Sequence, residues 1–269
     1  MDSLLLLYVA LFGGAGRDFP QAIAVDGAGH AIVSGSTASD DFPTTAGAIQ
    51  GKPKARAWHS FVMNTEGTRQ AFSTYLGGGA HSYGSALVAG ANGDVCVAGA
   101  TAAADFPVTA GAAQTKFGGS GGRRGAGDAF VAKFDASGKL IYASFFGASS
   151  DEGATAVGIS AQGECIIGGF TTSGDLATTR KSAYAKRPQG VLSGFLAVFS
   201  PDGSRITYAT YLPHDVSAMR VSAEGVGYVA GKDRVSRIGW NGKKESWSVV
   251  AGVDGSWIRA MALDGSDHL

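Results

Sequence analysis

The feature that most constrains the fold of this 269-residue chain is an internal repeat. A short segment of alternating apolar and small residues, ending at Gly or Pro, occurs five times. The copies are Tyr8–Gly13, Phe72–Gly77, Tyr142–Gly147, Tyr208–Pro213 and, more weakly, Trp247–Gly252. Self-similarity at a spacing of tens of residues is typical of architectures in which each unit packs on its neighbours.

Each repeat contains four segments with the period-two alternation of β-strands. In the first repeat they are Ala22–Val25, Ala31–Val33, Phe61–Asn64 and Phe72–Tyr75. Tight turns rich in Gly separate the first segment from the second and the third from the fourth. Four antiparallel strands in each repeat predict an all-β fold, a β-propeller of four-stranded blades. A solenoid or a β-sandwich is the alternative.

Two longer stretches resemble a known repeat family. Asp128–Gly147, together with the Asp-Phe-Pro loops Asp41–Gln50 and Asp105–Gln114, is similar to the SBBP type of bacterial β-propeller repeat. The resemblance spans nearly the whole chain and weakens in the fourth repeat. It implies a propeller, often in exported or cell-surface proteins, and no particular activity. We interpret the Asp-Phe-Pro loops themselves as scaffold, because Asp and Pro stabilise turns.

The repeats divide the chain, as one propeller domain, into four blades and a remainder. The blades run over 21–77, 85–147, 155–213 and 217–252, and a fifth combines 256–269 with 1–12. We expect Leu4–Leu11 and Trp257–Leu263 to close the ring at this last blade, which removes open sheet edges. The alternative is that the chain is part of a larger polypeptide.

Charge and cysteine content narrow the class of protein. Lys plus Arg and Asp plus Glu number 22 each, so the chain lacks the positive field of a general nucleic-acid binder. No apolar stretch approaches the ~18 residues of a membrane span, so we expect no membrane insertion. Cys96 and Cys165 are expected to be small buried hydrophobic residues. The sequence indicates no metal and no cofactor, and the family resemblance favours an extracellular or cell-surface location.

The long connections between the second and third strands of blades one to three should lie on one face. They are 36–60, 100–129 and 170–194, and they carry ten of the 22 basic residues. We call the basic residues of these three loops the basic arc. Long loops on a rigid scaffold often hold binding residues, so the basic arc could bind a polysaccharide or another cell-surface ligand. The alternative is that Lys and Arg only solvate flexible loops. The ligand-binding candidates are Lys54, Arg56, Trp58, His59, Arg123, Arg124, Arg180, Tyr184 and Arg187.

A catalytic alternative rests on side chains in the connections that enter each blade. Paired carboxylates at a suitable separation could cleave a glycosidic bond, and a histidine could remove a proton from a uronic acid. The candidates are Asp18, His81, Asp151, Glu152, His214, Asp215 and Asp254. Such carboxylates can equally bind backbone N–H groups at blade junctions.

The sequence therefore favours a non-catalytic propeller that binds a carbohydrate or other surface component through its long-loop face. The alternative is a polysaccharide lyase or glycoside hydrolase acting on an acidic glycan. A third hypothesis is a purely structural domain of a larger surface protein.

Overall fold

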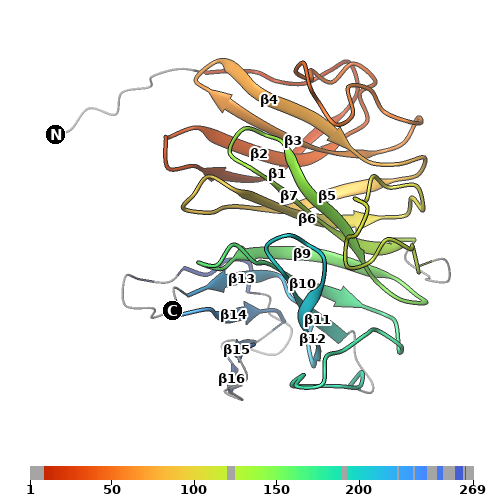
Figure 1. Ribbon diagram of the computed structural model, residues 1–269, viewed down its shortest axis with the longest axis vertical. Coiled ribbons are helices and arrows are strands. Elements are labelled where there is room, and N and C mark those ends of the chain that lie inside the picture. The colour runs from red at the N-terminus through yellow and green to blue at the C-terminus, as the bar shows by residue number, and fades with distance from the viewer. Residues whose placement is uncertain are drawn as a thin grey trace.

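The computed structural model describes residues 9–119, 125–188, 193–222, 224–232, 234–240, 247–250, 258–262 and 264. These residues form sixteen strands in four antiparallel sheets, which follow one another in chain order (Figure 1). The described residues include no helix long and apolar enough to cross a membrane.

Each sheet is a four-stranded meander. The first contains β1 (Asp18–Val25), β2 (Ala31–Thr37), β3 (His59–Glu66) and β4 (Arg69–Leu76). The second contains β5 (Ser82–Ala89), β6 (Val95–Thr101), β7 (Asp128–Phe134) and β8 (Leu140–Phe146). The third contains β9 (Glu152–Ile159), β10 (Cys165–Thr171), β11 (Ser193–Phe199) and β12 (Ile206–Leu212). The fourth contains β13 (Ala218–Val221), β14 (Val226–Ala230), β15 (Arg234–Gly239) and β16 (Trp247–Val250).

Successive sheets pack face to face, with their first strands side by side. β1 contacts β5, β5 contacts β9, and β9 contacts β13. A series of meanders in which the first strands adjoin and the later strands lie progressively outward is the blade arrangement of a β-propeller. The all-β fold and the four-stranded antiparallel blades are thus confirmed, and we number the sheets as blades one to four.

The described residues do not contain a fifth blade. Val9–Phe12, Ile258–Ala262 and Asp264 form no strand, and the other residues predicted for that blade lie outside the described part of the chain. One feature continues the repeat beyond blade four: Ile258 N donates to Gly231 O (3.2 Å), as Val216 N donates to Gly169 O (3.2 Å) one blade earlier. The fifth blade and its closure therefore stay a prediction.

The core consists of layers of apolar side chains between adjacent blades. Because successive strand residues point to opposite faces, each blade contributes one set to the layer before it and another to the layer after it. Between blades one and two, for example, Ile32, Val62 and Leu76 pack with Phe130 and Phe145. Comparable layers join blades two and three, and blades three and four. The stability of each blade thus depends on its neighbours.

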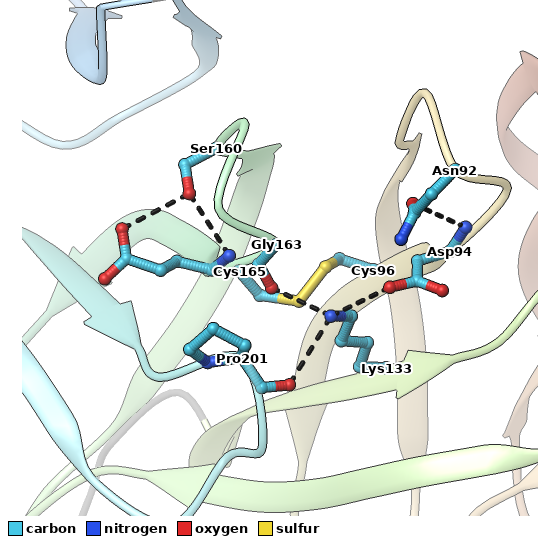
Figure 2. Close-up of a disulfide and its surroundings, with 9 residues drawn as sticks. Asn92, Asp94, Cys96, Lys133, Ser160, Gly163, Cys165 and Pro201 are labelled. Atoms are coloured by element: carbon cyan, nitrogen blue, oxygen red, sulfur yellow. Dashed lines mark hydrogen bonds and ion pairs between the residues drawn. A yellow bond between two sulfur atoms is a disulfide. The ribbon is translucent and has the colours of Figure 1, made fainter.

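A disulfide joins Cys96 of β6 to Cys165 of β10 and crosses the layer between blades two and three (Figure 2). The expectation of two separate small hydrophobic residues is wrong, although both cysteines are fully buried. Cys96 is the second residue of its strand and Cys165 is the first residue of the equivalent strand. This offset of one residue turns the two side chains to opposite faces of their own sheets, and those two faces meet between neighbouring blades.

A buried lysine stabilises the same interface. Lys133 of β7 is 3% exposed, and its Nζ atom lies 3.0 Å from Asp94 Oδ2 and donates to Gly163 O (2.8 Å) (Figure 2). The Nζ atom also donates to Pro201 O (3.4 Å). A buried ammonium needs an opposite charge and hydrogen-bond acceptors, and here turns from blades two and three provide them together.

The long loops of the first three blades begin by covering their own outer strand. In blade one, Thr45 N donates to Ser73 O (3.1 Å), and Tyr75 N donates to Gln50 O (3.1 Å). The equivalent bonds recur in the next two blades. They join Thr109 to Ala143, Phe145 to Gln114, Thr179 to Ala209 and Tyr211 to Tyr184. These loop segments satisfy backbone groups of the outermost strand, which would otherwise form an open edge.

Candidate functional site

Four aromatic rings from blades one and two lie in a row at the ends of the strands where the long loops emerge. Phe19 stacks on Trp58 with a centroid separation of 5.5 Å, and Trp58 lies 6.4 Å from Tyr83. Tyr83 in turn stacks on His81 at 5.9 Å. We call Phe19, Trp58, Tyr83 and His81 the aromatic row.

The backbone fixes each ring of the row. A bulge between Pro20 and Ala22 follows Phe19 in β1, and the same bulge between Gly84 and Ala86 follows Tyr83 in β5. Trp58 ends the long loop of blade one, and its backbone N–H donates to His81 Nδ1 (3.0 Å). The row is therefore preorganised by two strands and one cross-blade hydrogen bond.

The row is open to solvent. Phe19 is 52% exposed and Tyr83 is 38% exposed, His81 is exposed, and Trp58 is half-buried. Large aromatic rings normally contribute most to folding stability when they are buried. A row of partly exposed stacked rings instead presents flat apolar surfaces to a ligand.

The repeat itself does not require aromatic residues here. The position of Tyr83 is occupied by Gly153 in blade three, and the position of Trp58 is occupied by Gly127 in blade two. The backbone contacts are the same, since Trp58 O accepts from Ser82 N (2.8 Å) as Gly127 O accepts from Glu152 N (2.7 Å). The aromatic row is therefore an addition to the scaffold.

The other predicted ligand residues are distributed over three blades. Lys54 Nζ donates to Asp105 O (2.9 Å) in blade two, and Arg187 donates to Thr172 O (2.6 Å). His59 is buried, with Nε2 2.9 Å from Ala55 O. Arg56, Arg180 and Tyr184 are exposed. Arg123 and Arg124 lie outside the described residues, and the basic arc remains a prediction.

The predicted catalytic carboxylates bind backbone and hydroxyl groups at the blade rims. Asp18 accepts from Gly14 N (2.8 Å), and Glu152 accepts from Ala148 N (2.8 Å) at the equivalent position two blades on. Asp151 accepts from Ala126 N (2.9 Å) and Gly127 N (3.1 Å). These bonds order the connections between blades.

The predicted histidines differ in their surroundings. His214 is buried between Asp215 O (2.8 Å from Nδ1) and Ser236 Oγ (3.0 Å from Nε2), whereas His81 belongs to the aromatic row. Asp215 is half-buried, and Asp254 lies outside the described residues. No group of three or more His, Cys, Asp or Glu in the described ranges is placed to hold a metal ion. The catalytic assignment therefore stays a prediction.

The Asp-Phe-Pro loops have a structural role in both blades that contain them. Asp41 Oδ1 accepts from Ala15 N (2.7 Å), and Asp105 Oδ1 accepts from Gly79 N (2.7 Å). The Gly79 N–H, aided by Lys54, holds the pKa of Asp105 below its ordinary value. The following rings, Phe42 and Phe106, are each 3% exposed. These loops order the connections that lead into blades one and two.

A buried carboxylate lies beside the rim of blade three. Asp128 of β7 is fully buried, and burial raises its pKa to about 6, with the nearby negative charge of Glu152 adding to the effect. Burial also raises the pKa of Glu152. Asp128 Oδ2 accepts from Gly118 N (2.9 Å) and Gln114 Nε2 (3.2 Å), so the carboxyl group orders the long loop of blade two.

We expect Asp128→Asn to stabilise the protein at neutral pH. In the wild type, the folded state binds the proton more tightly than the unfolded state, whose carboxyl has a pKa near the ordinary 3.8. The contribution of Asp128 to the free energy of unfolding is therefore highest below about pH 4 and falls as the pH rises to about 6. Above that pH it is lower by roughly 3 kcal/mol. Asparagine removes this loss, because its amide oxygen can still accept both hydrogen bonds.

Urea unfolding between pH 4 and pH 8 measures this effect. The gain of Asp128→Asn should be near zero at pH 4 and largest above pH 6. Asp135→Asn is the control, because turn hydrogen bonds, first that of Ser137, lower the pKa of Asp135. That variant should lose stability at neutral pH. Equal gains for Asp128→Asn at both ends of the range would contradict the prediction.

The sequence matches no protein-family model and no curated protein. Solved structures give weak matches. A protein of unknown function from Bacteroides caccae is 11% identical, with a TM-score of 0.49, over 90% of this chain and 65% of its own. The Dos1 propeller is 10% identical, with a TM-score of 0.46, over 88% and 49%. A gluconolactonase from Xanthomonas campestris is 9% identical, with a TM-score of 0.48, over 93% and 67%. The chain thus spans less than two thirds of the first two structures.

Proposed function

We propose that this β-propeller is a non-catalytic binding module that recognises a carbohydrate through the aromatic row on its long-loop face. The observation that carries the proposal is that Trp58 and Tyr83 each stand where a neighbouring blade has glycine, Gly127 and Gly153. Their rings lie 6.4 Å apart, and they stack on Phe19 and His81 respectively. Sugar rings have flat C–H faces, which suit contact with aromatic rings held rigidly in place.

The surroundings of the row supply polar groups for the hydroxyls or charges of such a ligand. Arg56 precedes Trp58 by two residues, and Arg17 precedes Phe19 by two residues, and both are exposed. These guanidinium groups favour a glycan that carries some negative charge. The basic loop residues Arg123 and Arg124 stay part of this proposal as a second contact on the same face.

The disulfide supports the proposed location outside the cell. Disulfides persist in oxidising compartments and are rare in the reducing cytosol. The Cys96–Cys165 bond is therefore consistent with an exported or cell-surface protein.

The test is a glycan array followed by calorimetric titration of the retained glycan. Trp58→Ala should weaken binding by about 30-fold, because truncation of a central aromatic contact costs about 2 kcal/mol. Ile141→Ala is the control, since Ile141 is an exposed apolar residue (40%) on β8, outside the row and outside the predicted ligand residues. Unchanged affinity of Trp58→Ala would overturn the assignment to the row, and retention of no glycan would overturn the function.

The alternative function is cleavage of an acidic glycan. The paired carboxylates proposed for that reaction bind blade-rim groups, and no described contact joins them around one cavity. Incubation of the retained glycan with the wild-type protein, with release of reducing ends as the readout, distinguishes the two functions. Release of product that depends on His81 or Glu152 would favour the enzyme.

A further inference from the structure

The buried ammonium group of Lys133 occupies a site whose parts recur at the interface between blades one and two. At the interface between blades two and three, Lys133 Nζ donates to Gly163 O (2.8 Å) and Pro201 O (3.4 Å) and pairs with Asp94 (Figure 2). Both carbonyl groups belong to turns of the following blade. The site thus combines one side chain from the third strand of a blade with two turn carbonyls from the next blade.

The position of Lys133 is occupied by Asn64 in blade one. Each pairs with the second residue of the preceding strand, Cys96 or Ile32. Asn64 is 4% exposed, and no described group donates a hydrogen bond to its Oδ1 atom. A buried acceptor without a donor destabilises the fold, so this oxygen atom is a candidate ligand for something that the protein binds.

The two turn carbonyls also have counterparts in blade two. Gly93 takes the place of Gly163, since each closes a turn through its N–H group (3.0 and 2.9 Å) and has a positive φ (83° and 80°). Ala136 takes the place of Pro201, as the second residue of the next turn. A Cβ on Gly93 would lie 2.8 Å from the Cβ of Ala136, so the two turns are in contact. Within the described part of the chain, neither of these two carbonyls accepts a hydrogen bond.

The two interfaces have the same geometry next to these turns. Phe72 stacks on Phe134 with centroids 6.0 Å apart and ring planes at 19°. At the next interface, Tyr142 stacks on Phe199 at 6.4 Å and 23°. Phe134 and Phe199 lead directly into the two turns compared above. The turn carbonyls of blade two therefore approach Asn64 as those of blade three approach Lys133.

The two sites differ in charge. Asparagine ends in an acceptor oxygen where lysine ends in a charged donor. The anion beside Lys133, Asp94, is replaced in blade one by His30, which is paired with Asp26 (3.0 Å). The interface between blades one and two thus offers three neutral oxygen atoms where the next interface holds a cation.

We propose that Asn64 Oδ1, Gly93 O and Ala136 O bind a monovalent metal cation, K⁺ or Na⁺, in place of a lysine ammonium group. Carbonyl oxygens suit such ions, whereas Ca²⁺ and Mg²⁺ bind mainly through carboxylates. Asparagine is shorter than lysine by two bonds, a span of about 2.5 Å that matches a cation–oxygen contact. Ala136 is exposed, so water can complete the coordination shell.

Thermal unfolding of the full 269-residue chain in different chloride salts tests the proposal. The midpoint should be higher in KCl or NaCl than in tetramethylammonium chloride of equal ionic strength, because the organic cation is too large to contact three converging oxygen atoms. A metal cation present at about ten times its dissociation constant should raise the midpoint by about 3–6 °C. Equal midpoints in the three salts would overturn the proposal.

Two substitutions of Asn64 separate binding at this site from general effects of salt. Asn64→Val removes the oxygen ligand and introduces the residue that blade three has at this position, Val198. Its midpoint should be the same in KCl and in tetramethylammonium chloride. Asn64→Lys places an ammonium group in the site, so its midpoint should also be independent of the metal cation.

Ser34→Ala is the matched control. Ser34 is buried on the same face of blade one, its hydroxyl has no hydrogen-bond partner among the described residues, and Ala98 stands at its position in blade two. This variant should keep the full difference between KCl and tetramethylammonium chloride. A difference that survives in Asn64→Val, or that disappears in Ser34→Ala, would show that the cation binds elsewhere and would overturn the assignment.

Discussion

Replacing Cys96 and Cys165 together with alanine is expected to lower the free energy of unfolding by about 4 kcal/mol. The bond closes a loop with a sequence separation of 69 residues, and a loop of that length loses much of its chain entropy in the unfolded state when it is cross-linked. The loss should also uncouple blades two and three, because the bond crosses the layer between them.

Urea unfolding with and without dithiothreitol measures the effect of the disulfide. The wild type should shift to a lower midpoint in reductant, and the double variant should have the same low midpoint under both conditions. Cys96 and Cys165 are fully buried, so the reductant must be present during unfolding. An unchanged wild-type midpoint would mean that the bond contributes nothing to stability.

The second large effect is expected for Gly138→Ala, at about 4 kcal/mol. Gly138 has φ of 84°, a left-handed conformation that costs an alanine about 1–2 kcal/mol. A Cβ at this position would also overlap the ring carbons of Phe72 from blade one. Overpacking in a tight interface adds about 1–3 kcal/mol.

Gly67→Ala separates the two contributions. Gly67 occupies the equivalent turn in blade one, has φ of 59°, and has no atom within 4 Å of the position of a Cβ. Its substitution should cost only the backbone part, about 1 kcal/mol, in the same chemical unfolding experiment. Equal losses for the two variants would show that the contact of the turn with the neighbouring blade does not matter.

The repeat alone predicted most of the architecture. The segments Ala22–Val25, Ala31–Val33, Phe61–Asn64 and Phe72–Tyr75 all lie within β1 to β4. The observed strands are longer, because bulges such as the one after Pro20 let pairing continue toward the loops. Alternation and Gly-rich turns are local properties, so they can be identified in one sequence.

The disulfide was missed because pairing between blades depends on side-chain direction. In the aligned repeats Cys96 and Cys165 stand one residue apart, so their side chains point to opposite faces of their own sheets. In three dimensions neighbouring copies present opposite faces to each other, and the offset is the arrangement that a bond requires.

The aromatic row was found only in part. Trp58 was a candidate for ligand binding and His81 for catalysis, whereas Phe19 and Tyr83 lie just before the predicted bounds of blades one and two. A comparison of the repeats could have indicated them, since Gly153 replaces Tyr83 in blade three. The distances that join the four rings come from two blades and from a loop, so no local pattern contains them.

The loops that cover the outer strands have a consequence for how such a chain can change over generations. Because Thr45 and Gln50, and their counterparts in the next two blades, protect the outer strand of their own unit, each blade carries this protection with it. A gene segment that encodes one blade could be duplicated or deleted without exposing the unpaired backbone groups of an outer strand. Blade four has only residues 231–233 between β14 and β15, so it lacks a long loop of this kind. Selection against aggregation should therefore act most strongly on the outer strand of that blade.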